Sequence, residues 1–504
     1  MCDTIVVNRR FSEERQNILV KNSDRPLGEC QPLGYFPAGT TREPLPFVKE
    51  TDLGLFAGTG LSPEGSRYAV LGSRPYWLYG FEMGANEKGL FIGNEAEGSR
   101  CPAEKEEGIL GMDMLRYALE AAATAQEAIR LIGELLARYG QSANASRLFD
   151  RRYENTYILC DPKETWVMET AGREWAAKKI PYFETVSNCY TIETEYDLCS
   201  ENMVKTIRDN RWLHPEEPVN FAKAYTAPAP RQRMSVPRRN RMSKLMLDVL
   251  TSHIPEKEMD HFEDMLEKDS SDDKKILSAL QTYGCRTGLE ELSYILTDHF
   301  SEEINEGRFS RIGGENCSIC MHANTRDEAQ TAASMLMTYA DGLGYRFRWA
   351  PASPCESVYL PVWWVTANGV SSGGPVLPEL MSRGGETYDG ASLWWVMERL
   401  VTLSSVDDSR YDYLIYRQLD DLSYEIRRDA ANAETEAKAL VKKGDLAGAQ
   451  KLLDSLTARF AEELLHTAAA LCEGISEEIR DAGGLYGPRK EFLEEYAART
   501  QMPL

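Results

Sequence analysis

Residues 1–7 read MCDTIVV and residues 17–26 read NILVKNSDRP, and these two stretches decide the fold that the chain can adopt. Each holds a run of β-branched and aliphatic residues, which is typical of a buried strand. The polar residues 12–16 between them predict a reversal of direction, so the two strands are expected to pair antiparallel. In such a hairpin Lys21 and Asp24 return to the neighbourhood of Cys2.

The cysteine at position 2 has two explanations. The chain contains 11 cysteines, so one can fall there by chance. Alternatively, removal of Met1 leaves Cys2 with a thiol and a free α-amine on one residue. An α-amine with an ordinary pKa of about 7.7 to 8.0 can take the proton of a thiol at neutral pH. Lys21 would favour the thiolate and Asp24 would orient the amine, so the pattern indicates a nucleophile that needs no histidine.

Composition and charge limit the class of protein. The chain has 504 residues, of which 42% are hydrophobic and 27% charged, as expected of a packed globular protein. Its formal charge of −22 opposes binding to nucleic acid and to anionic membranes. We find neither a leader sequence nor an apolar stretch of about 18 residues, which predicts a cytoplasmic protein without a membrane partner. The scattered cysteines are expected to be reduced.

Strand-like runs recur through the first 360 residues. The segment TYILCDPKETWVMET at 156–170 predicts a hairpin that turns at 161–164. Two helices interrupt the strands, one from 111 to 123 and a second that begins at a capping box of Thr124 and Glu127. This order predicts a layered α+β fold with an antiparallel core. The other strand-like runs are NILVKNSD, RYAVLGSRP, GLFIGNEA, FETVSNCYTI, NCSICMHA and SVYLPVWW.

The strand signal weakens in two places. Residues from about 196 to 306 predict a mainly helical insertion, with a solvated loop at 267–275. Residues 391–504 are also helical, and they include a long amphipathic helix expected to end at Gly474. The predicted organisation is therefore a core of residues 1–370, including the insertion, and a helical C-terminal region of residues 371–504 packed on it.

Three familiar signatures are weighed and set aside. The segment CSICMH suggests a metal or redox site, but on an alternating strand Cys317 and Cys320 would point to opposite faces, so a core strand is favoured over a metal site with His322. None of the six histidines lies in a local pattern typical of a Cys–His dyad. The glycine-rich stretch at 58–65 has neither the Walker spacing nor the pattern G-x-G-x-x-G, so a nucleotide-binding site is not supported.

Six motifs in order resemble one family. MCDT, VKNSDRP, NEKGLFIGNEA, TYILCDPKETWVMETAGREW, VSNCYTI and SPCESVYLPVW are similar to the secernin-like dipeptidases, a branch of the N-terminal nucleophile hydrolases. More distant relatives of that family are bile salt hydrolase and penicillin V acylase. The resemblance runs over roughly the first 365 residues, and it implies a four-layer αββα sandwich of two antiparallel sheets between helices.

The resemblance also implies roles for single residues. Cys2 is the expected nucleophile, and Asp24 the carboxylate that holds its α-amine. Lys21 stands where the acylase relatives have an arginine, which keeps the charge but loses the bidentate fork. Asn94 and Asn188 are similar to two asparagines that line the acylase site and could stabilise an oxyanion. Within PRRNRMSKLM, the arginine of the site is best matched by Arg238, with Arg239 and Arg241 as alternatives.

The family activity is hydrolysis of dipeptides, and this is the predicted function, with small peptides as partners and with no metal or organic cofactor. Two alternatives remain open. One is an acylase that cleaves an N-acyl amide on the same scaffold. The other is a non-enzymatic interaction protein, since secernin-like relatives include members associated with regulated secretion. The sequence leaves open whether Met1 is removed and whether the chain forms a homo-oligomer.

Overall fold

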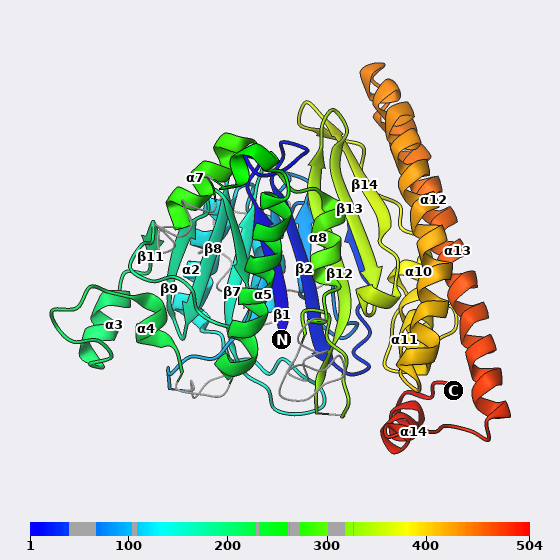
Figure 1. The fold of residues 1–504 in the computed structure, drawn as a ribbon. Helices are drawn as coiled ribbons and strands as arrows, with labels where there is room; N and C mark the ends of the chain where they lie inside the picture. Colours follow the sequence, from blue (N-terminus) through cyan, green and yellow to red (C-terminus); the bar gives the residue numbers. More distant parts are fainter. Residues whose placement is uncertain are drawn as a thin grey trace.

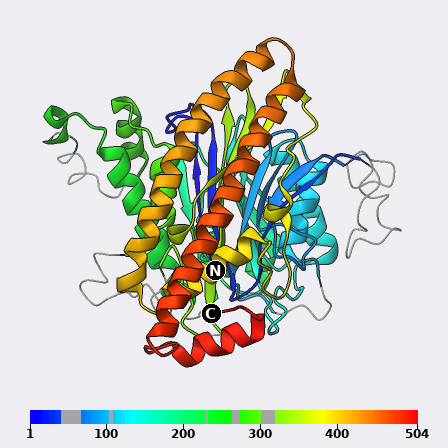
Figure 2. The same cartoon turned by 90° about the vertical axis from the view of Figure 1, so that its right-hand side faces the viewer.

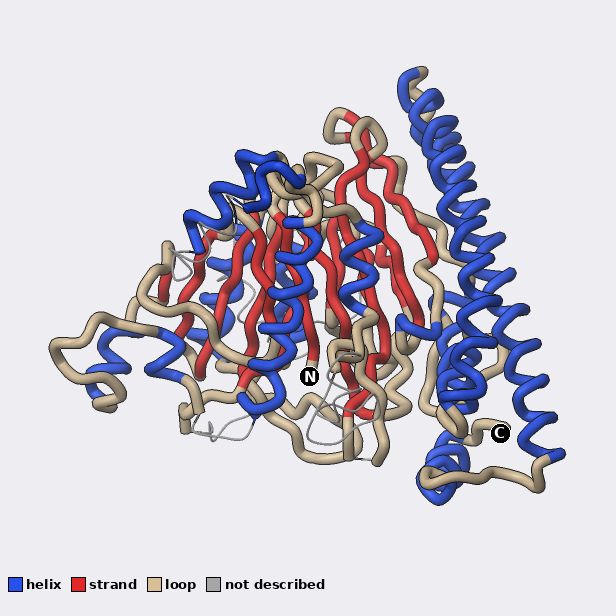
Figure 3. The backbone as a smooth tube through the Cα atoms, in the orientation of Figure 1, coloured by secondary structure: helices blue, strands red, loops and turns tan. Residues whose placement is uncertain are grey.

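The computed structural model describes residues 1–39, 67–102, 108–227, 231–260, 262, 273–300, 318–325 and 327–504. The glycine-rich stretch at 58–65, most of the charged segment 267–275 and Cys317 lie outside these residues. Two β-sheets form the centre of the molecule, with helices on their outer sides (Figures 1 and 3). Every pair of neighbouring strands described here is antiparallel.

The first sheet carries the N-terminus on the strand next to one of its edges. Its spatial order is β10 (Phe183–Val186), β1 (Cys2–Val7), β2 (Ile18–Pro26), β12 (Ala329–Ala340), β13 (Gly344–Pro351), β14 (Leu360–Ala367) and β15 (Val370–Ser371). The hairpin of β1 and β2 has the predicted geometry, with Cys2 opposite Ser23 and Thr4 opposite Lys21. The other neighbour of β2 is β12, which comes from the far end of the core sequence.

The second sheet stacks on the first. Its spatial order is β11 (Leu198–Cys199), β9 (Glu174–Lys179), β8 (Thr165–Ala171), β7 (Glu154–Cys160), β6 (Phe91–Glu97), β5 (Met83–Asn86), β4 (Val70–Ser73) and β3 (Leu33–Phe36). Strands β1 and β2 lie against β6 and β7. The predicted hairpin between β7 and β8 is present, and Asp161 Oδ1 accepts hydrogen bonds from the backbone of Lys163 and Glu164 in its turn.

Alternation along the strands explains the layers. Val6 and Leu19 point into the core between the sheets, whereas Ile5 and Val20 point to the helices on the outside. Burial on both faces requires a helical cover on each sheet, so the predicted α+β class with four layers, helix, sheet, sheet and helix, is confirmed.

One cover is formed by α1 (Gly111–Ala121) and α2 (Ala125–Tyr139), which pack on the second sheet. Thr124 caps α2 as predicted, because its side chain accepts from the backbone N–H of Glu127. The other cover is formed by α5 (Arg231–Thr251) and α8 (Leu289–Leu296) on the first sheet. The other helices that the structure describes before residue 371 include α3 (Met203–Asp209), α4 (Phe221–Tyr225), α7 (Asp273–Tyr283) and the short 3₁₀ helix η2 (Pro354–Glu356).

The last part of the chain is helical. Its helices are α10 (Glu379–Ser382), α11 (Leu393–Ser404), α12 (Asp408–Lys442), α13 (Leu446–Asp481) and α14 (Lys490–Thr500). Figure 2 shows α12 and α13 as a long pair along one side of the molecule, where they contact β14. Helix α13 does not end at Gly474 as predicted but continues to Asp481, because a glycine inside a packed helix costs only about 1 kcal/mol. Gly483 and Gly484, both with positive φ, follow the true end.

The segment NCSICMHA differs from its prediction as a core strand. Residues 318–321 form no strand, with bends at Ile319 and Cys320, and the backbone N–H of Cys320 donates to the carbonyl oxygen of Asp298 instead of a strand neighbour. Among the described residues, no helix is both long and apolar enough to cross a membrane.

Candidate active site

Cys2 begins β1, the second strand from one edge of the first sheet, and it is 4% exposed. It shares the inward face of the hairpin with Thr4 and Lys21, because these residues alternate with the outward-facing Asp3 on paired strands. The site therefore lies between the two sheets, at the end of the strands where the chain begins.

Asn188 and Arg238 surround the backbone of Cys2. The backbone nitrogen of Cys2 donates to Asn188 Oδ1 at 3.0 Å. Arg238 donates to the same oxygen at 2.7 Å and to the carbonyl oxygen of Cys2 at 3.4 Å. Its Nε also pairs with Asp3 Oδ2 at 2.9 Å, and both side chains are fully buried. Arg238 thereby joins helix α5 to the first residues of β1.

The other two arginines of the cluster have different partners. Arg239 pairs with Glu184 at 3.1 Å, and Arg241 pairs with Asp298 at 2.8 Å. Of the three alternatives that the sequence left open, Arg238 is the one that contacts Cys2 in this structure.

Asp24 lies beside the chain start. Its backbone N–H donates to the carbonyl oxygen of Met1 at 3.0 Å, and its carbonyl oxygen accepts from the terminal amine of Met1 at 3.3 Å. Thr331, on β12, donates to Asp24 Oδ1 at 2.7 Å. The second carboxylate oxygen, Oδ2, is buried and has no hydrogen-bond partner among the described residues. Burial raises the pKa of Asp24, and the positive charges of the terminal amine and Arg238 oppose this shift.

The sulfur of Cys2 faces charged groups. It lies 4.0 Å from Glu82 Oε2, which is 3.8 Å from the ammonium of Lys21. Burial raises the pKa of the Cys2 thiol to about 11, although Lys21 lowers it. Burial also opposes the charge of Lys21, but the neighbouring Cys2, Glu95 and Glu82 raise the pKa of Lys21 overall. With Met1 in place, the thiol is therefore protonated at neutral pH beside a permanently charged lysine.

Asn94, on β6, lies behind this group. Turned so that both ends of its amide are satisfied, its nitrogen donates to Glu82 Oε2 at 3.2 Å and to the Glu82 carbonyl oxygen at 3.1 Å. The nitrogen of Asn188 donates to the carbonyl oxygen of Ala96 at 2.8 Å. Asn188 therefore presents its oxygen to Cys2, which is the geometry for holding the nitrogen of Cys2 rather than an oxyanion.

Two cavities adjoin the chain start. A small one of about 10 Å³ is lined by Cys2, Asp24, Glu82 and Asn94, and it shares Tyr153 with a larger cavity of about 330 Å³. Asn188 lines the larger cavity. The volume of the larger cavity is at the lower end of the range for small-molecule sites.

Three buried residues of the site were not singled out from the sequence. Glu82 bridges Lys21 and Arg25, and Arg25 contacts Glu82 Oε1 at 3.0 Å. Glu95 accepts a hydrogen bond from Thr4, and burial raises its pKa to about 8. Arg25 and Glu95 lie inside the motifs DRP and GNEA, so the sequence motifs could have identified them as candidate site residues. Glu82 lies in no such motif, and only the stacking of the two sheets reveals it.

The fold and the site define a protein with two stacked antiparallel sheets and a cysteine at the start of its first strand. Residues 67–306 match the model of Peptidase family C69, which confirms the predicted resemblance to the secernin-like cysteine peptidases over this range. The match places the chain among the cysteine hydrolases of peptide or amide bonds. It does not extend to Cys2, Lys21 or Asp24, whose roles stay predictions.

Solved structures with similar folds include two of conjugated bile acid hydrolase from Clostridium perfringens, one of the mutant C2A and one of a second single-residue variant. Each is 13% identical and covers 69% of this chain; the alignments cover 88% and 89% of those chains, with TM-scores of 0.33 and 0.35. A third is the Caenorhabditis elegans ortholog of N-acylethanolamine-hydrolyzing acid amidase, with 12% identity, coverage of 38% of this chain and 71% of that chain, and a TM-score of 0.24.

Proposed function

We propose that this protein is a dipeptidase whose nucleophile is Cys2 after removal of Met1. The observation that carries the proposal is the setting of Cys2, whose nitrogen is held by Asn188 and whose sulfur lies near Lys21 and Glu82. A buried thiol, a buried cation and an oriented nitrogen at one point are the parts that an N-terminal nucleophile requires.

Removal of Met1 activates the site by changing the nitrogen. In the unprocessed chain the nitrogen of Cys2 belongs to a peptide bond and cannot accept a proton. Once Met1 is removed, that nitrogen becomes an amine that keeps Asn188 Oδ1 as an acceptor. Asp24 Oδ2, which is buried without a partner among the described residues, is the candidate for a second acceptor. Asp24 and Asn188 then orient the lone pair of the amine toward the thiol.

The reaction follows from these positions. The amine takes the thiol proton, and the thiolate attacks the scissile carbonyl carbon to form a tetrahedral oxyanion. The amine then returns the proton to the leaving nitrogen, and the acyl group remains on Cys2 as a thioester. Water, deprotonated by the same amine, releases the product acid and restores the thiol. Asn94 lines the small cavity with Cys2 and is the candidate oxyanion donor once one of its bonds to Glu82 is exchanged for the substrate oxygen, a role worth on the order of 10² to 10³ in rate.

The larger cavity supports a substrate with two charged ends. Its lining includes the guanidinium of Arg152 and the carboxyl groups of Glu97 and Glu154. A guanidinium pairs with a carboxylate terminus, whereas a carboxylate pairs with an ammonium terminus. Unblocked dipeptides carry both charges within a few ångströms, so they match this lining better than an uncharged acyl chain does.

The test combines the chain start with a substrate panel. Cys2→Ala, or a tag that keeps Met1 in peptide linkage, is expected to abolish hydrolysis of dipeptides with an unchanged circular dichroism spectrum. Cys199→Ala, which removes an exposed cysteine far along the chain, is the matched control and should retain activity. Full activity of Cys2→Ala or of the tagged protein would refute the proposed nucleophile.

The same panel separates the alternatives. Dipeptides with acetylated amino ends or amidated carboxyl ends should show kcat/KM lower by at least about tenfold, since a lost charge pair of about 1.4 kcal/mol corresponds to that factor. Faster cleavage of N-acyl amides than of free dipeptides would favour an acylase. Mass spectrometry that finds Met1 retained in the purified protein, together with absent hydrolysis, would favour an interaction protein.

A further inference from the structure

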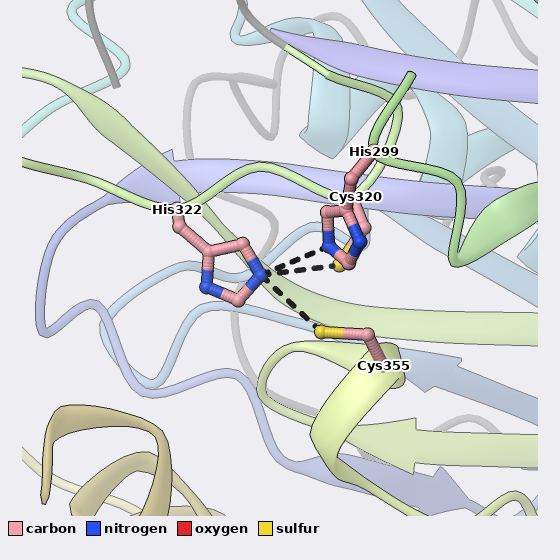
Figure 4. A group of neighbouring side chains, drawn as sticks. All are labelled: His299, Cys320, His322 and Cys355. Carbon is pink, nitrogen blue, oxygen red and sulfur yellow. Dashed lines mark hydrogen bonds between the residues drawn. The ribbon is translucent and has the colours of Figure 1, made fainter. Parts of the chain in front are cut away.

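Four potential metal ligands lie close together near β2. They come from three segments that are far apart in the sequence. His299 follows helix α8, Cys320 and His322 lie in the segment before β12, and Cys355 lies in η2. Figure 4 shows His299, Cys320 and Cys355 around Nε2 of His322. Their ligand atoms all lie within 4.8 Å of one another.

The distances approach those of a tetrahedral zinc site. Nε2 of His322 lies 3.3 Å from Nε2 of His299, 3.7 Å from Sγ of Cys320 and 3.2 Å from Sγ of Cys355. With bonds of about 2.05 Å to nitrogen and about 2.3 Å to sulfur, a tetrahedron requires about 3.3 Å between two nitrogens and about 3.5 Å between nitrogen and sulfur. All four ligand atoms lie within 4.8 Å of one another, whereas a tetrahedron requires about 3.8 Å between two sulfur ligands.

We propose that His299, Cys320, His322 and Cys355 bind one structural Zn²⁺ ion. Two thiolates and two neutral imidazoles around a divalent cation give a complex with no net charge. That neutrality suits the burial of Cys320 and His322, because an isolated buried charge is costly. Four protein ligands fill the tetrahedron and leave no position for water, so the ion would hold the chain together and perform no chemistry.

The sequence pattern hid this site. The spacing within CSICMH pairs Cys317 with Cys320, but Cys317 lies outside the described residues. The partners of Cys320 and His322 come instead from positions 299 and 355. They can meet because residues 318–321 do not form the expected strand.

The site lies one residue from a hydrogen-bond chain that reaches Asp24. The backbone N–H of Met321, between two of the ligands, donates to Thr331 Oγ1 at 2.9 Å, and the carbonyl oxygen of Met321 accepts from the Thr331 N–H at 3.0 Å. Thr331 Oγ1 in turn donates to Asp24 Oδ1 at 2.7 Å. A zinc ion that fixes this loop would therefore fix the hydroxyl that orients Asp24.

A second connection runs to β2 directly. The side-chain nitrogen of Asn22 donates to the carbonyl oxygens of Leu296 and Ile319, at 2.8 and 3.1 Å. Leu296 and Ile319 are close neighbours of the ligands His299 and Cys320 in sequence. The proposed ion thus lies behind the strand that carries Lys21 and Asp24, on the opposite side from the cavities.

The experiment measures metal in the full chain. Protein purified without a polyhistidine tag is desalted and analysed by inductively coupled plasma mass spectrometry, and about one zinc per chain is expected. The double variant Cys320→Ser with Cys355→Ser should contain none, whereas Cys199→Ala and Cys2→Ala should match the wild type. If the double variant does not fold, His299→Gln supplies the comparison, with zinc retained more weakly during dialysis against a chelator.

Cobalt tests the geometry independently of activity. Protein freed of metal by chelation and titrated with Co²⁺ alone should develop the visible bands of tetrahedral cobalt and the near-ultraviolet bands of thiolate ligands. Absence of zinc in the folded wild type together with no cobalt spectrum would overturn the proposal. A disulfide between Cys320 and Cys355 in the folded protein purified under reducing conditions, found by peptide mass mapping, would also overturn it.

Discussion

Retention of Met1 should suppress the reactivity of Cys2 by a measurable factor. Burial raises the pKa of the Cys2 thiol from its ordinary 9.0 to about 11 while the nitrogen of Cys2 is still an amide. At pH 8 a thiol of that pKa is about one part in a thousand thiolate, against about one part in ten for an ordinary thiol. Because the thiolate is the nucleophile, alkylation should be slower by about 100-fold before any loss from limited access is counted.

The assay is a pulse of iodoacetamide at several pH values, with Cys2 modification read by peptide mass spectrometry. An N-terminal extension keeps Met1, and N-acetylcysteine is the reference thiol. Limited access of iodoacetamide to Cys2 lowers the rate by the same factor at every pH. The shape of the plot of rate against pH therefore depends only on ionisation of the thiol. The rate at Cys2 should rise about tenfold per pH unit from about 7 to 10, whereas the reference levels off near its own pKa. A plateau below about pH 9 in the extended protein would refute this account of the site.

Three other substitutions have defined outcomes. Lys21→Met should lower the free energy of unfolding in urea by about 3 kcal/mol, because it removes one of the two cations that pair with buried Glu82, whereas exposed Lys205→Met should change it little. Thr331→Val should lower kcat/KM about fivefold, for about 1 kcal/mol of lost orientation of Asp24; an unchanged kcat/KM would contradict that role. Burial raises the pKa of Glu398 from 4.5 to about 7, so the folded state binds the extra proton and stability should fall by about 3 kcal/mol as pH rises through this interval. Glu398→Gln should remove this dependence of stability on pH, measured by thermal unfolding. If the dependence persists in the variant, another group causes it.

Local patterns were sufficient for much of the core. The β1–β2 hairpin, the turn at 161–164 and the cap at Thr124 depend on neighbouring residues, and the structure confirms each of them. The two sheets could be expected for the same reason. Successive side chains of a strand point to opposite faces, so a continuous apolar run requires burial of both faces.

Long-range contacts set the limit of such reasoning. Glu82 comes beside Cys2 because the second sheet stacks on the first, and no pattern near residue 82 encodes that contact. Arg238 reaches Asp3 across 235 positions through the packing of α5 on β1. The end of α13 was misplaced because a helical glycine costs less than the packing around it contributes. The strand expected at 317–322 was wrong over its described residues, because its alternation fits a local rule, whereas Asp298 and Thr331 hold that segment in bends.

The pairing of β2 with β12 sets an order of events during synthesis. Cys2 leaves the ribosome early, but Thr331, whose hydroxyl donates to Asp24, follows Asp24 by 307 positions. At about 5 to 20 residues per second, that interval lasts about 15 to 60 s. An aminopeptidase can act on the emerging Met1 during this interval, before the sheet closes over the chain start. In the proposed enzyme, trimming can therefore precede assembly, so that the nucleophile is prepared while the nascent chain still lacks the strand that completes its surroundings.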